Sequence, residues 1–248
     1  MNKSLSMFVG GILIGALVAT AGFSLFLRGQ KGAGGGQQQL VLKLGHCLDT
    51  NHPVHKGMEF MKQRLEAMSG GTVTIDIYPS SVLGSEVQCI EQLQNGSLAM
   101  TKTSAASIEN FIPAMSVFGL PYVFRDADHY WNVLNSEIGK RLLEKGEGKF
   151  LRGLCYYDSG SRNFYTKEKP IRTPDDLKGL KIRVMNSKTA MDMVKAMGGA
   201  PTPIAWGELY SALAQGTVDG AENNLPSFTS NKHYEVCKHF TRDRKSVV

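Results

Sequence analysis

From Leu40 onward the chain alternates between stretches with strand periodicity and stretches with helix periodicity, and this alternation constrains the fold more than any other feature. Leucines recur at every second position over residues 40–44, which predicts a first strand, and residues 72–78 alternate in the same way. Between them, the apolar residues of 54–68 are spaced by three and four and share one helix face. This order is typical of α/β proteins, in which helices cover a mostly parallel sheet.

The alternation continues through most of the chain. Further helices are predicted over residues 86–95, 126–143, 187–197, 208–215 and 227–239. Further strands are predicted over residues 98–104, 150–157, 180–184 and 218–221. The segment Thr173-Pro174-Asp175-Asp176 is typical of the capped start of a short helix.

Residues 1–29 precede this body and carry an export segment. Lys3 comes before an apolar run from Phe8 to Leu27. The small residues of Ala19-Thr20-Ala21 favour a cleaved signal peptide, whereas a run close to the ~20 residues that span a bilayer favours a retained membrane anchor. Both interpretations stay open. Residues 30–39, rich in Gly and Gln, are predicted to be a flexible linker. We therefore expect the folded body to work outside the cytoplasm.

The charge distribution excludes a nucleic-acid partner. The net charge is +6, but five of the 28 basic residues lie within residues 1–29 and 241–248, against one of the 22 acidic residues. The body from residue 30 to residue 240 is therefore nearly neutral, and it has no basic stripe interleaved with aromatic residues.

The four cysteines predict neither a metal site nor redox catalysis. None of them stands in a CxxC or zinc-type spacing, and four cysteines allow three disulfide connectivities, which the sequence leaves open. Buried free thiols are the plainer interpretation. The residues are Cys47, Cys89, Cys155 and Cys237.

Polar residues follow or end several predicted strands, where ligands of open α/β sheets bind. Arg183 lies near the carboxyl end of strand 180–184, on the face opposite Ile182, and its planar fork can bind a carboxylate. Arg162 is predicted in a small-residue loop after strand 150–157, and Asn223 follows strand 218–221. Trp206 could wall such a site. Each of these residues can also be explained without a ligand, as part of a surface ion pair, as a turn residue or as a core residue.

Motifs for catalysis are missing. The sequence contains no GxSxG, P-loop, HExxH or GxGxxG pattern. His52 and His55 flank a predicted helix start without further metal ligands, and Ser104 and Ser161 have no identifiable His and Asp partners. No cofactor and no enzymatic activity are predicted.

A series of short motifs resembles the DctP-type solute-binding subunits of tripartite ATP-independent periplasmic (TRAP) transporters, from about Leu40 to Phe240. Each motif is weak alone, and their order and spacing carry the resemblance. The first motifs are Tyr78-Pro79-Ser80-Ser81, Leu83-Gly84, Leu120-Pro121-Tyr122, Gly179 to Val184 and Pro201-Thr202-Pro203. The most specific block is Glu208-Leu209-Tyr210, Ala212-Leu213, Gln215-Gly216, Val218-Asp219-Gly220 and Glu222-Asn223.

The resemblance implies a two-lobed α/β fold with a hinge, closing over a small organic acid that a membrane permease then receives. The lobes are expected over residues 40–160 and 161–240. Dicarboxylates, uronates and related sugar acids are all compatible. The family pattern implies these ligand-binding residues: Arg183 as carboxylate anchor, Arg162, Asn223, Trp206, His46 and Ser104. Ser104 stands where the sialic-acid-binding branch carries an acid, which disfavours that substrate.

Family chains normally continue well past residue 248, so the C-terminal part of the second lobe is expected to be truncated. Residues 241–248 also resemble read-through into a sequencing adapter and are predicted to be a non-native tail. Two other functions stay open. One is an exported enzyme acting on a sugar acid, with Glu222 or Asp219 as base. The other is a membrane-tethered sensory protein.

Overall fold

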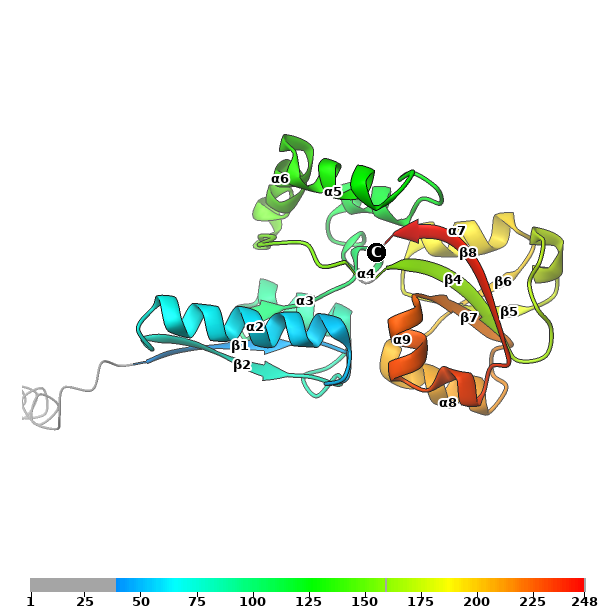
Figure 1. The fold of residues 1–248 in the computed structure, drawn as a ribbon, viewed down its shortest axis with the longest axis horizontal. Helices are drawn as coiled ribbons and strands as arrows, with labels where there is room; N and C mark the ends of the chain where they lie inside the picture. Colours follow the sequence, from blue (N-terminus) through cyan, green and yellow to red (C-terminus); the bar gives the residue numbers. More distant parts are fainter. Residues whose placement is uncertain (1–38, 159, 248) are drawn as a thin grey trace, which may run out of the picture. The chain divides into compact units, whose positions relative to one another are not determined.

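The computed structural model describes residues 39–158 and 160–247. The chain divides into the units Met1–Gln39 and Leu40–Val248, so the body begins where the strand pattern begins. The predictions for the export segment 1–29, and nearly all of the linker 30–39, lie outside the described residues. The body is mixed α/β structure with two separate sheets (Figure 1).

The first sheet is parallel, in the order β2-β1-β3. Its strands are β1 (Leu40–Gly45), β2 (Val73–Tyr78) and β3 (Met100–Thr101). The helix α2 (Pro53–Met68) runs along this sheet (Figure 1) and buries Val54 and Met58 against Leu44 and Ile75. His52 caps the first turn of α2, since its ring accepts a hydrogen bond from the backbone N–H of Val54.

One short helix precedes β3, and the other short helices of this half follow it. They are α3 (Glu86–Gln94), α4 (Ala105–Ile108), η1 (Pro113–Gly119), α5 (Ala127–Asn135), α6 (Glu137–Glu144) and η2 (Glu147–Lys149). The single helix predicted over residues 126–143 is two helices, because Ser136 has an extended backbone. Its Oγ accepts from the N–H of Ile138, so Ser136 ends α5 and caps α6.

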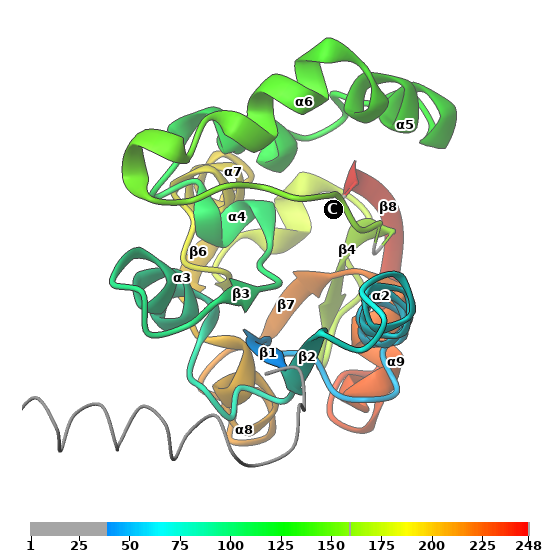
Figure 2. The same cartoon turned by 90° about the vertical axis from the view of Figure 1, so that its left-hand side faces the viewer.

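The second sheet has the order β6-β5-β7-β4-β8. Its strands are β4 (Ser161–Thr166), β5 (Lys181–Val184), β6 (Ala200–Pro203), β7 (Gly220–Asn223) and β8 (His239–Val247). Strand β5 runs parallel to β6 and β7, whereas β4 is antiparallel to both β7 and β8. Figure 2 shows β4 between β7 and the edge strand β8. The sheet is therefore mixed rather than mostly parallel.

Helices pack two apolar clusters against the second sheet. The cluster of β5 and α7 (Lys188–Ala196) includes Ile182, Val184 and Val194. The cluster of β7 and α8 (Leu209–Ala214) includes Leu213 and Tyr165. The remaining elements are η3 (Pro174–Leu177), which carries the predicted capping box, η4 (Trp206–Glu208), α9 (Leu225–Ser230) and η5 (His233–Glu235).

Two further predictions of secondary structure are wrong, one for a strand and one for the length of a helix. Residues 150–157 have strand character but pair with no strand among the described residues. The helix predicted over residues 227–239 stops at Ser230, and Lys232 takes a left-handed backbone with φ 53°. Residues 239–247, which include most of the predicted non-native tail 241–248, form β8 and pair with β4.

Side chains from the first half of the body form several hydrogen bonds with the second half. A carboxylate oxygen of Glu109 accepts from Ser187 Oγ at 2.8 Å and from the N–H of Thr189 at 3.0 Å, at the start of α7. Asn110 donates to the carbonyl of Asn186, and His52 contacts Ser227 Oγ at 3.2 Å. Over residues 39–158 and 160–247, no helix is long and apolar enough to cross a membrane.

Candidate functional site

Strand β7 brings three of the predicted site residues together. Strands β4 and β5 flank β7, with Asn163 opposite Asn223 and Arg183 opposite Ala221. Arg162, Arg183 and Asn223 all line one cavity of about 590 Å³, together with Trp206 and Ser104. Arg162 stands inside strand β4, where the sequence predicted a loop, and its ladder partner is Ser246 of β8.

Arg183 is the largest side chain that is almost fully buried in the described part of the chain, at 1% exposure. Strand β5 exposes Lys181 and buries Ile182 and Arg183, so the strand does not expose the basic face that its alternation indicated. The Nε of Arg183 donates to the carbonyl of Ile204 at 2.9 Å, and one terminal nitrogen, Nη1, has no hydrogen-bond partner. Burial lowers the pKa of Arg183, and the nearby Arg162 adds to this.

Burial of a guanidinium donor without a partner costs free energy that a matching acceptor recovers. Arg183 forms no salt bridge with any carboxylate among the described residues, and the indole of Trp206 lies 5.9 Å from its Cζ. The cavity therefore contains a buried cation that can accept an anion from outside the protein.

Arg162 is equally buried but is already neutralised. Its Nε and one terminal nitrogen bind both carboxylate oxygens of Glu222, the latter at 2.7 Å, and the same nitrogen donates to the Glu222 carbonyl at 2.6 Å. Its other terminal nitrogen donates to Asn223 Oδ1 at 3.1 Å. Burial opposes the charge of Arg162, but Glu222 outweighs burial and raises the pKa of Arg162 above its ordinary value.

The opposite wall of the cavity is organised by Glu86, a residue that the sequence analysis did not single out. One carboxylate oxygen of Glu86 accepts from Ser104 Oγ at 2.9 Å and from the Ser104 N–H at 3.1 Å, and Lys102 Nζ lies 3.5 Å away. The other oxygen accepts from Ser107 Oγ at 2.7 Å. Burial opposes the charge of Glu86, but Lys102 and the hydroxyl donors outweigh it, and the pKa of Glu86 is lowered.

A sequence signal for Glu86 existed. It follows Ser85, which caps α3 and forms a capping box with Gln88. An acid in the first turn of a helix is usually a dipole or capping residue, so the pattern alone favours a local role. Only the fold shows that Lys102 and Ser104 converge on this carboxylate.

His46 does not line this cavity. The backbone N–H of Leu48 donates to its Nδ1 at 3.1 Å, and its Nε2 lies 3.0 Å from Nδ1 of His55. Burial and the neighbouring His55 lower the pKa of His46 to about 4. Both ring nitrogens are therefore engaged inside the first half of the body.

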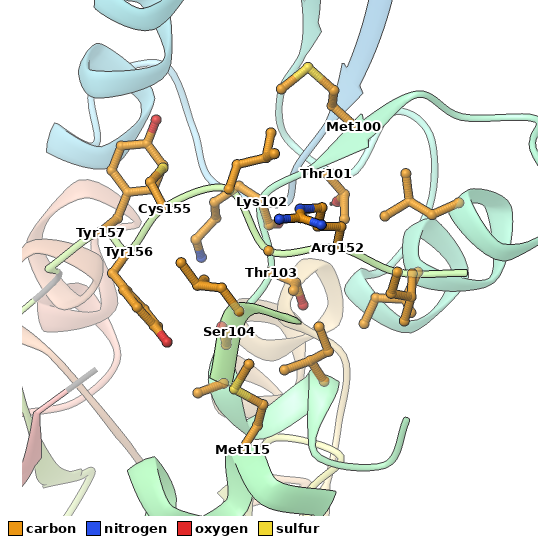
Figure 3. Close-up of a pocket in the computed structure, with 18 of the residues that line it drawn as sticks. Met100, Thr101, Lys102, Thr103, Ser104, Met115, Arg152, Cys155, Tyr156 and Tyr157 are labelled. Carbon is orange, nitrogen blue, oxygen red and sulfur yellow. Dashed lines mark hydrogen bonds between the residues drawn. The ribbon is translucent and has the colours of Figure 1, made fainter. Parts of the chain in front are cut away.

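A second cavity of about 450 Å³ shares Lys102 and Ser104 with the first and suits an anion poorly (Figure 3). Its lining is mostly apolar and includes Met100, Met115 and Tyr157. Of its two cations, Arg152 is paired with Glu147 and Lys102 with Glu86. This cavity offers no unpaired buried cation among the described residues.

The described residues offer little for metal binding or for thiol chemistry. No set of three His, Cys, Asp or Glu side chains is placed to hold a metal ion among residues 39–158 and 160–247. The four cysteines carry free thiols there, and only Cys155 is exposed. Cys47 lines the cavity that contains Arg183. Burial raises the pKa of this thiol to about 11, so it stays protonated at neutral pH.

Comparison with known proteins gives the family. The model of the bacterial extracellular solute-binding proteins, family 7 (DctP), matches residues 44–247. The chain belongs to the DctP family. Within this family, the C4-dicarboxylate-binding periplasmic protein of Rhodobacter capsulatus is 34% identical over 230 residues, covering 92% of this chain and 68% of that protein. Two other curated relatives are 35% and 36% identical, and the chain spans only 64% and 57% of their length.

Solved structures of DctP-family proteins share the two-lobed fold. A TRAP periplasmic solute-binding protein of Anaerococcus prevotii, with bound glucuronate, has a TM-score of 0.82 and 38% identity, covering 84% of this chain and 68% of that one. One from Sulfurospirillum deleyianum, with bound succinate, has a TM-score of 0.81 and 33% identity at the same coverage. The predicted family and fold class are thus confirmed.

Proposed function

We propose that this chain captures a small organic acid outside the cytoplasm, in the periplasm, and delivers it to the membrane subunits of a TRAP transporter. One observation carries the proposal: Arg183 is a buried cation without a carboxylate partner, and it lines a cavity. The relatives of this chain include proteins with bound glucuronate, galactonate and succinate, all of which carry a carboxylate.

The other predicted residues receive roles that follow from their contacts. Arg162 and Asn223 form one unit with Glu222, and the amide of Asn223 can donate to a ligand because its oxygen is already engaged by Arg162. Trp206 walls the cavity beside Arg183, and Ser104 contributes to the facing wall. We assign His46 to the support of that wall, since neither of its nitrogens is available to a ligand.

We further propose that the ligand is bound without being transformed. Glu222 and Asp219, the two candidate bases, are both engaged: Glu222 binds Arg162, and Asp219 accepts from the backbone N–H of Lys181 at 2.7 Å. Neither Glu222 nor Asp219 is among the residues that line the cavity, so neither is placed to take a proton from a ligand bound there. The lobe boundaries at residues 40–160 and 161–240 and the membrane partner belong to the same proposal.

Replacement of Arg183 tests the anchor. Loss of one partner of a buried hydrogen-bonded charge pair costs about 2–5 kcal/mol of binding, or roughly a 30- to 5000-fold weaker Kd. Arg183→Ala should therefore abolish the thermal shift that D-galacturonate or succinate produces in the wild type, and Arg183→Lys should restore part of it. Arg64→Ala, which removes an exposed arginine of α2, is the matched control.

Two results would contradict the proposal. An Arg183→Ala variant that keeps the wild-type thermal shift would exclude Arg183 as the anchor. Turnover of a stabilising acid, followed by proton NMR of the incubated ligand, would favour the exported enzyme instead.

A further inference from the structure

The cations of the cavity can be assigned to pairs, while Glu91 and Glu208 also line it and form no salt bridge among the described residues, and these charges together limit the charge of the ligand. Three cations line the cavity: Lys102, Arg162 and Arg183. Arg162 is neutralised by Glu222, and Lys102 lies 3.5 Å from a carboxylate oxygen of Glu86. Among the described residues that line the cavity, Arg183 is then the one buried cation without a carboxylate. The cavity can neutralise one carboxylate of a ligand but not two.

Glu86 and Lys102, which also line the cavity, form a buried ion pair. The Glu86 and Lys102 side chains are each only 12% exposed, so water screens their charges weakly. The pKa of Glu86 lies below its ordinary value, so Glu86 is a carboxylate at neutral pH. Its pull on Arg183 and Arg162 contributes to the pKa of both arginines, which indicates that Glu86 acts across the cavity.

A carboxylate and a hydroxyl meet this pair differently. A second ligand carboxylate beside this pair would meet Glu86 as like charge, and Lys102 is already engaged by Glu86, so the second carboxylate would gain no full counter-charge. A ligand hydroxyl can instead donate to Oε2 of Glu86, which accepts from Ser107 Oγ and has a second acceptor position. The Ser104 and Ser107 hydroxyls already donate to Glu86, and their oxygens can still accept from a ligand hydroxyl.

We infer that the ligand is a monocarboxylate rich in hydroxyl groups, that is a sugar acid, and that Glu86 selects it against dicarboxylates. This inference rests on the proposed function and narrows it. Both ligand classes occur among the relatives, with glucuronate in one and succinate in another, so the comparisons leave the choice open. Glu86 acts as a specificity residue: it accepts from the hydroxyls of a sugar acid and repels a second carboxylate.

Calorimetric titration of the whole chain with D-galacturonate, D-galactonate and succinate at neutral pH tests the inference. Wild type should bind at least one of the two sugar acids roughly 10-fold or more tighter than succinate, a factor that corresponds to about 1.4 kcal/mol. Glu86→Gln should weaken the sugar acid and strengthen succinate, so that the ratio of the two Kd values changes by about 10-fold or more. Glu86→Asp keeps the charge and should keep the preference.

Glu137→Gln is the control, since it removes one negative charge from an exposed position of α6 and should leave the ratio unchanged. Binding of none of the acids by wild type would contradict the proposed function itself. Succinate binding as tight as that of the sugar acids would overturn only the present inference, and this result needs no variant. An unchanged ratio in folded Glu86→Gln would remove Glu86 as the selecting residue.

Discussion

Acidification from pH 7 to pH 5 should destabilise the protein through three buried histidines. His46, His52 and His233 are each at most 1% exposed. Burial is the main cause that lowers the pKa of each to about 4, from an ordinary value of 6.5. His55 and Lys102 contribute further at His46, Lys102 at His52, and Arg183 at His233.

The hydrogen bonds explain why these rings stay neutral. The backbone N–H of Leu48 donates to Nδ1 of His46, and that of Val54 donates to Nδ1 of His52. Each Nδ1 is therefore an acceptor, and the neutral ring carries its proton on Nε2. In His52 this Nε2–H reaches Ser227 Oγ, in the second half of the body. Protonation of Nδ1 would break a backbone hydrogen bond and place two N–H groups against each other.

The magnitude follows from the difference in pKa between the two states. In the unfolded chain these histidines bind protons below about pH 6.5, whereas in the folded chain they bind them only near pH 4. The free energy of unfolding is therefore at its full value above this window and decreases as the pH is lowered through it. At pH 5 each histidine costs about 2 kcal/mol, since one pKa unit corresponds to about 1.4 kcal/mol. Three such residues cost up to about 6 kcal/mol, which is comparable with the whole stability of many domains.

Urea unfolding at pH 7, 6 and 5, followed by circular dichroism, measures this loss. The window above pH 5 isolates the histidines, because the lowered pKa of Glu86 places its titration below 4.5. His52→Asn keeps an acceptor that can cap α2 but does not titrate, so its loss between pH 7 and pH 5 should be about 2 kcal/mol smaller than that of wild type. Equal losses in both proteins, or none in wild type, would refute the reasoning.

Two further predictions concern stability. Glu109→Gln retains an acceptor for Ser187 and Thr189 but loses the charge at the start of α7, and urea unfolding should show a cost of about 1 kcal/mol, with Glu109→Ala costing at least twice as much. Leu213→Ala, at a fully buried position, should cost about 2–5 kcal/mol in the same assay, whereas Leu225→Ala, at a position 54% exposed, should stay near 0.5 kcal/mol; similar costs for the two would contradict the assigned core.

The elements that the sequence predicted well are those whose signal is local. The strand predicted over 180–184 is β5, Lys181–Val184, and the helix predicted over 187–197 is α7, Lys188–Ala196. The alternation of β5 is contained in one short segment, and so are the periodicity of α7 and its capping residue Ser187. The strand predicted over 150–157 failed because periodicity indicates an extended segment but not whether another strand lies beside it.

In the candidate site, too, local patterns were predictive and contacts between distant segments were not. Strand alternation selected Arg183 as a residue near a strand end, and the fold places it in a cavity with Arg162 and Asn223. The pairing of Arg162 with Glu222 could not be predicted from the sequence, because it joins positions 60 residues apart on the neighbouring strands β4 and β7. Glu86 was missed because its ordinary interpretation is a helix-capping acid.

Arg162 and Arg183 lie on the two strands that flank β7, are nearly equally buried, and differ only in their partners. Glu222 compensates the buried charge of Arg162, whereas no carboxylate compensates the buried charge of Arg183 until an anion binds. The free energy that Arg183 costs in the empty cavity is recovered on binding, so occupancy and stability are linked at this residue. The same linkage explains why the thermal shift produced by an organic acid, rather than the melting temperature alone, is the measurement that reports on Arg183.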